Sequence, residues 1–189
     1  MPRALRVLAV AVAIALSVGM LATPAAASAP TKAKPAAWAK TVCTALGDWR
    51  AKIVSAAADA GTNPPTTAAQ GKKALLKLTG KSLAATKALV AKLKKAGPPA
   101  VSGGGDVASI VIDQFNQAAR TFATVRKSLK KLSTDDPGAF VNASRTAEDA
   151  LESGLEHVQA ALNAGTTLDV APLVTAFNAE SACQDLTLT

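Results

Sequence analysis

Apolar residues recur along the chain at intervals of three and four, with polar residues between them. The pattern is clearest over residues 106–133, where the steps are 4, 3, 4, 3, 4 and 3 at Val111, Phe115, Ala118, Phe122, Val125, Leu129 and Leu132. Such a seam is typical of a helix packed in a bundle. Asp106 is predicted to cap the start of this helix, and Lys130 and Lys131 suit the negative end of its dipole.

Two further helices are predicted before this one, over residues 35–60 and 66–96. The first ends where a glycine and two prolines follow, and its apolar stripe consists of Trp38, Val42, Ala45, Trp49, Ile53 and Ala56. The second has leucines over roughly half of its surface and lysines over the rest, namely Lys73, Lys77, Lys81, Lys92 and Lys95. Gly80 inside it costs about 1 kcal/mol relative to alanine and marks a potential kink.

The stretch GPPAVSGGG at residues 97–105 separates the second helix from the third. Its last three glycines precede a helix, as glycines do in phosphate-binding loops. The chain has no Gly-Lys-Ser/Thr motif there, however, and Asp106 would repel an anion. We therefore expect these glycines to form a flexible hinge.

Two helices are predicted after residue 135. Asp136 and Pro137 supply a cap followed by a proline at the first helical position, and Gly165 ends that helix; its inner positions are Phe140, Ser144, Ala147, Leu151, Gly154, Val158 and Leu162. A short fifth helix is predicted over residues 169–183. Pro172 is compatible with it only in the first turn, and the inward positions are Leu173, Val174 and Phe177.

The sequence as a whole predicts an all-α fold. Alanine, a strong helix former, is abundant, and no run of alternating β-branched residues indicates a sheet. Helices of roughly 25–30 residues each span about 40 Å at 1.5 Å per residue. We therefore expect an antiparallel bundle of four or five helices, forming one domain over residues 36–189.

The first 35 residues are predicted to lie outside this domain. Arg3 and Arg6 precede an apolar run from Val7 to Ala22, and small residues suited to cleavage follow, as in a secretory signal peptide. The run is shorter than the roughly 20 residues that a membrane span needs. We expect residues 1–27 to be the signal peptide and residues 28–35 a flexible tether, so the mature chain would have no transmembrane span and would be secreted, either extracellular or associated with the cell wall.

The chain has two cysteines, Cys43 in the first predicted helix and Cys183 in the last. A reactive thiol and a metal ligand are the alternatives to a disulfide. Both are disfavoured, because the chain has no Cys-x-x-Cys motif and only one histidine, His157. In an exported chain two cysteines favour a disulfide, which would join the first and last helices and close the bundle.

No residue pattern indicates catalysis, a metal or a cofactor. His157 lacks the second histidine of a zinc motif, and the serines lack the glycine context of a nucleophile elbow. Glu148, Glu152 and Glu156 form a row at a spacing of four that could attract calcium, but the loop carbonyls of a calcium site are missing. A solvated face, or pairing with the lysines, explains this row better, and we expect the protein not to be an enzyme.

Charge is divided unequally along the chain. Residues 28–95 hold 13 Lys/Arg and 2 Asp/Glu, a net of +11, whereas residues 96–189 hold 6 and 11, a net of −5. The two halves could face each other, or the basic half could form an interaction surface. The lysine side of the second helix is the better functional lead: it could contact anionic cell-wall polymers, a lipid surface or a protein partner, or it could simply solubilise the bundle. Nucleic acid is disfavoured, since no aromatic residues lie among the lysines for base stacking.

Trp38 and Trp49 lie on one face of the first predicted helix, about three turns apart. Core packing explains them, but with Phe115 and Phe122 they could also line a small apolar pocket between helices. The alternative function is therefore an extracytoplasmic carrier or sensor of a small apolar ligand.

The chain resembles the small secreted helical proteins of actinobacteria. The resemblance rests on the segment ATPAAASA at residues 22–29, on WAKTVCTALGDW at residues 38–49, and on Cys183 near the end. It implies export and a helical fold, and it implies no activity.

Overall fold

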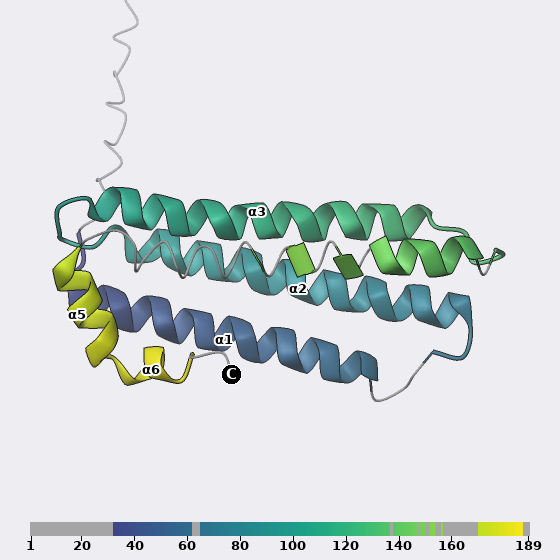
Figure 1. The fold of residues 1–189 in the computed structure, drawn as a ribbon, viewed down its shortest axis with the longest axis horizontal. Coiled ribbons are helices and arrows are strands. Elements are labelled where there is room, and N and C mark those ends of the chain that lie inside the picture. Colours follow the sequence, from purple (N-terminus) through teal and green to yellow (C-terminus); the bar gives the residue numbers. More distant parts are fainter. Residues whose placement is uncertain are drawn as a thin grey trace, which may run out of the picture.

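The computed structural model describes residues 32–61, 65–136, 138–146, 148–149, 152–153, 156 and 170–186. Three long helices lie side by side (Figure 1): α1 (Pro35–Gly61), α2 (Ala68–Ala96) and α3 (Gly104–Lys131), with α2 in the middle. Two short helices, α5 (Ala171–Ala179) and α6 (Ser181–Gln184), pack against α1 near one end. Residues 138–146, 148–149, 152–153 and 156 are also helical, and no strand occurs among the described residues. The predicted all-α bundle is confirmed.

Side-chain contacts show that neighbouring long helices are antiparallel. Asp48 of α1 pairs with Lys92 of α2, while Asp59, further along α1, pairs with Lys81, which comes earlier in α2. Between α2 and α3, Lys72 donates a hydrogen bond to the carbonyl oxygen of Leu132 at 2.6 Å. In each pair of helices, the start of one lies against the end of the other. Neighbouring long helices are therefore antiparallel, and the chain reverses its direction between them.

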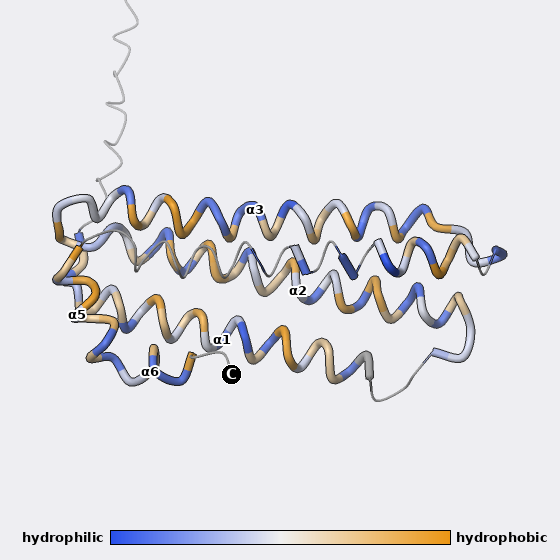
Figure 2. Tube along the Cα trace, viewed as in Figure 1, coloured by the Kyte–Doolittle hydropathy of each residue, from blue (hydrophilic) through white to orange (hydrophobic). Residues whose placement is uncertain are grey.

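The apolar stripes predicted for α1 and α3 form the core. Figure 2 shows the apolar positions of α3 alternating with polar ones, on the side that faces α2. The buried seam residues are Trp38, Val42, Ala45, Trp49 and Ala56 from α1 and Val111, Phe115, Ala118, Phe122, Val125 and Leu129 from α3. Many of these side chains are small, so the helices approach closely, and hydrophobic burial holds the bundle together.

Two glycines let neighbouring elements approach α2. A Cβ at Gly71 would lie 2.6 Å from Cζ of Phe140, and a Cβ at Gly80 would lie 3.3 Å from Nε of Arg126. Helix α2 continues unbroken through Gly80, so the glycine makes room for the Arg126 side chain and does not divide the helix.

The start of α3 differs from the prediction. The cap residue is Gly103, with a left-handed φ of 70°, and Asp106 lies in the first turn. The prediction that Asp106 caps the helix was therefore wrong. The chain enters α3 through glycine because Gly104 lies against the carbonyl oxygen of Pro99, where a Cβ would overlap. Asp106 still lies at the positive end of the helix dipole.

The loop between α2 and α3 is held by hydrogen bonds on several sides. Ala33 donates to Pro98 O at 3.0 Å, and its own carbonyl accepts from Ala100 N at 2.7 Å. The indole Nε1 of Trp38 donates to Gly97 O at 2.8 Å. The loop thus anchors the entry to α1, and Ala33, from the segment expected to be a tether, is hydrogen-bonded to the domain. Gly104 and Gly105 form the first turn of α3, and the flexible hinge expected at residues 103–105 stays a prediction.

The last predicted helix is two helices. Glu180 has an extended backbone between α5 and α6, and its carboxylate accepts a hydrogen bond from Ala182 N, so it ends the first helix and caps the second. Pro172 lies in the first turn of α5, as expected. Leu173 is fully buried, and the ring of Phe177 packs edge-on against Trp38 at 5.8 Å between centroids.

The start of the fourth predicted helix is confirmed. Asp136 Oδ1 accepts hydrogen bonds from the backbone nitrogens of Gly138 at 2.8 Å and Ala139 at 3.1 Å, which is the geometry of an N-cap. Several positions predicted for this helix lie outside the described residues, namely Ala147, Leu151, Gly154, His157, Val158, Leu162 and Gly165.

Candidate functional site: the lysine face of α2

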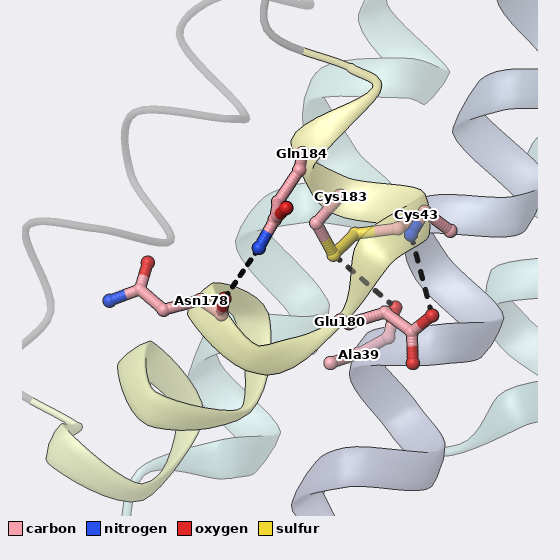
Figure 3. Close-up of a disulfide and its surroundings, with 7 residues drawn as sticks. Ala39, Cys43, Asn178, Glu180, Cys183 and Gln184 are labelled. Carbon is pink, nitrogen blue, oxygen red and sulfur yellow. Dashed lines mark hydrogen bonds between the residues drawn. A yellow bond between two sulfur atoms is a disulfide. The ribbon is translucent and has the colours of Figure 1, made fainter.

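The predicted disulfide is present. Figure 3 shows Cys183 of α6 joined to Cys43 of α1, with 5.0 Å between their Cα atoms. Gln184 Nε2 donates to the carbonyl oxygen of Asn178 at 3.1 Å, which ties α6 back to α5. Both cysteines are therefore used, and the C-terminal helices are fixed to α1 at one end of the bundle. A reactive thiol is excluded.

The four predicted pocket aromatics all lie in the core. Trp38 and Trp49, with Phe115 and Phe122, are each at most 8% exposed. Trp49 packs edge-on against Phe115 at 5.8 Å, and its Nε1 donates to Thr86 Oγ1 at 3.0 Å. Both indole nitrogens are thus paired within the protein. The ligand-pocket hypothesis stays a prediction that these contacts do not favour.

Three of the five lysines predicted to contact anions form ion pairs with α1. Lys81 Nζ lies 2.5 Å and Lys77 Nζ lies 3.5 Å from Asp59 Oδ2, and Lys92 Nζ lies 2.7 Å from Asp48 Oδ2. The other two, Lys73 and Lys95, are exposed and have no ion pair within the described part of the chain. We call these five residues the lysine face: Lys73, Lys77, Lys81, Lys92 and Lys95.

The two aspartates remain charged in this setting. The hydrogen bond from Lys92 and then its charge lower the pKa of Asp48, and the hydrogen bond and charge of Lys81 do the same for the pKa of Asp59, with a smaller effect of Lys77. Both carboxylates are exposed, so their ion pairs orient the lysine side chains more than they stabilise the fold.

The aspartates neutralise only a small part of the positive charge. Helix α2 has eight lysines and no acidic residue, and α1 has three Lys/Arg and two aspartates. The two helices together therefore carry a net charge of +9. Lys52 of α1 is exposed beside α2 and continues the positive surface across the helix boundary.

An open groove runs between α1 and α2 beneath the lysine face. It encloses about 580 Å³, and its lining is Asp48, Ala51, Lys52 and Ser55 from α1 and Lys81, Ala84 and Ala85 from α2. Its floor is mainly alanine and its rim is charged. Along α1 the lining runs from Asp48, which pairs with Lys92, to Ser55, seven residues or about 10 Å. Asp59, which pairs with Lys81, lies about one helical turn beyond Ser55.

Sequence reasoning found the lysines and missed the groove. Ala51, Ser55 and Ala84 of the lining lie on the outward side of their helices, where alanine and serine are common on any solvated surface. They form a groove only because α1 and α2 align Asp48 with Lys92 and Asp59 with Lys81. That register depends on tertiary packing.

The described residues offer no metal site and no membrane span. Among them, no group of three or more His, Cys, Asp or Glu side chains could hold a metal ion. None of the helices that the structure describes is long and apolar enough to cross a bilayer. His157 lies outside the described residues.

Comparison with protein-family models, curated proteins and solved structures gave no match. The arguments about function therefore rest on the residues of this chain.

Proposed function

We propose that this protein is exported and binds an anionic partner outside the cell through the lysine face, without catalysing a reaction. The observation that carries the proposal is the charge of α2, which has eight lysines, no acidic residue and only two aspartates of α1 opposite them. The disulfide between Cys43 and Cys183 supports export, because disulfides persist mainly in oxidising compartments.

The shape of the lysine face favours an extended anion. Its outermost members, Lys73 and Lys95, are 22 residues apart on one helix, which is about 33 Å at 1.5 Å per residue. Alanine and serine are the residues between the lysines at the groove, and no aromatic side chain is available there to enter a bilayer. Contact with a cell-wall polymer or with lipid head groups at a membrane surface would therefore be electrostatic.

Co-sedimentation of the mature protein, residues 28–189, with cell-wall material and with anionic or neutral vesicles tests the proposal. We expect binding to the anionic samples alone and its loss between about 0.05 M and 1 M salt, where the Debye length falls from more than 10 Å to about 3 Å. The variant Lys73→Glu/Lys95→Glu reverses the two unpaired lysines and should weaken binding strongly.

The matched control is Lys127→Glu/Lys130→Glu. These lysines are exposed on α3, and the control makes the same change in net charge at a site away from the lysine face. Equal losses in the two variants would show that net charge alone matters. Absence of binding to every anionic sample would refute the proposed function itself.

A further inference from the structure

The glutamate row Glu148, Glu152 and Glu156 is an exposed acidic surface in a protein with an exposed basic groove. All three residues are helical and exposed. Their spacing of four places them on one side of the predicted helix, over about 12 Å. Among the described residues no ion pair includes them, since the salt bridges of the lysine face use Asp48 and Asp59.

The groove has the dimensions and chemistry to accept such a row. Along α1 its lining runs from Asp48 to Ser55, seven residues or about 10 Å, which is close to the length of the glutamate row. Lys52 and Lys81 line it, and Lys77 and Lys92 pair with Asp59 and Asp48, so four lysines and two carboxylates lie in or beside the groove. Two positive charges therefore remain for an occupant.

Within the groove itself the alanine floor favours a helix as the occupant, whereas the full length of the lysine face suits an extended anion. Ala51 and Ala84 expose apolar surface between the charged rims, and Ala85 is buried beside them. A flexible polyanion gains nothing from burying that surface. A helix brings Cβ and methylene groups to the floor, small floor residues let its backbone approach closely, and its glutamates reach the lysines on either side.

We propose that the groove between α1 and α2 binds the glutamate row of a second copy of this chain. The inference rests on the proposed function, which assigns the lysine face an anionic partner. It names the glutamate row of a second copy as that partner when no cell-wall polymer or anionic lipid competes for the lysines. If the glutamate row of each copy binds in the groove of the other, two identical contacts form a closed dimer. The positive net charge of both copies opposes association, so the dimer is weak and depends on salt.

Sedimentation equilibrium of the mature, oxidised protein over a wide concentration range tests this inference. In about 0.05 M salt the average mass should rise with concentration toward that of a dimer, and in about 1 M salt it should stay at the monomer value. A monomer at every concentration in low salt would overturn the inference.

Two variants locate the contact. Glu148→Gln/Glu152→Gln/Glu156→Gln should raise the dimer dissociation constant about tenfold, as expected for the loss of several exposed ion pairs. Its control, Asp106→Asn/Asp113→Asn/Asp135→Asn, changes the net charge equally at exposed positions outside the row and should not raise the constant.

Filling the groove provides a test without any change of charge. Ala51→Leu/Ala84→Leu replaces two exposed groove residues by leucine. Leucine is a good helix former, so the fold should be retained. Its larger side chains fill the groove, so dimerisation should be lost. Dimerisation that survives in this variant would overturn the groove as the contact.

The two proposals can fail separately. Neither the glutamine variant nor the leucine variant should weaken binding to anionic vesicles, because both leave every lysine in place. A protein that binds anions but never dimerises would retain the proposed function and lose this inference.

Discussion

Replacing both cysteines by alanine should destabilise the protein by about 4–5 kcal/mol while leaving the helices formed. The disulfide joins Cys43 to Cys183 across a sequence separation of 140 residues. In the chain-entropy model a cross-link of that length removes about 17 cal/mol/K from the unfolded chain, which is about 5 kcal/mol at 25 °C.

The folded state of the double variant should persist because α5 has its own contacts with the core. Leu173 is fully buried, and Phe177 packs on Trp38 without help from the sulfur atoms. Cys43 is only 3% exposed, so its replacement also removes some packing. Reduction of the unaltered protein by a thiol keeps the sulfur atoms in place and separates the two effects.

Urea unfolding measures the change in the free energy of unfolding, and thermal unfolding measures the change in Tm. Both are followed by circular dichroism and by tryptophan fluorescence. For a chain of this size 1 kcal/mol shifts Tm by about 2–4 °C, so the expected fall in Tm is about 10–20 °C. Fluorescence should report the same transition as circular dichroism, because Trp38 contacts α5. A loss of stability below about 1 kcal/mol would refute the chain-entropy reasoning, and a fluorescence transition that precedes the loss of helix would show that α5 opens on its own.

Three further changes test individual contacts. Gly104→Ala should lower stability by about 1–3 kcal/mol in thermal unfolding, since the added Cβ would overlap the carbonyl oxygen of Pro99, and an unchanged Tm would contradict the close approach. Thr86→Val leaves the buried Nε1–H of Trp49 without its acceptor and should cost about 1–3 kcal/mol in urea unfolding, whereas a neutral result would show that another acceptor replaces it. The pKa of Asp59 is lowered in the folded state, so its contribution to stability is present above the unfolded pKa of about 3.9 and is lost as pH falls through the folded pKa. Asp59→Asn should therefore flatten the dependence of Tm on pH below about pH 4, and a pH profile identical to that of the unaltered protein would contradict the pairing.

The helices that packing defines were predictable, and their ends were less so. The 4–3 spacing on α3 reports which side is buried, and burial decides the conformation of the seam from Val111 to Leu129. The start of α3 depends instead on Gly103 and Gly104, because the chain must pass close to Pro99, a contact between segments that periodicity does not record. The disulfide needed no geometry for its prediction, since two cysteines allow one pairing.

The candidate site shows the same division between local pattern and tertiary register. The lysines of α2 are visible in the sequence, but which of them are paired depends on how α1 lies against α2. Both carboxylates that pair with them, Asp48 and Asp59, come from the same basic half of the chain. Within the described residues the acidic half therefore leaves the lysine face uncovered, which argues against the interpretation that the two halves neutralise each other. The basic surface and the acidic row are both exposed and are therefore available to other molecules. Lys77, Lys81 and Lys92 are already paired with α1. Charge reversal at Lys73 and Lys95, which have no ion pair among the described residues, therefore tests binding most directly.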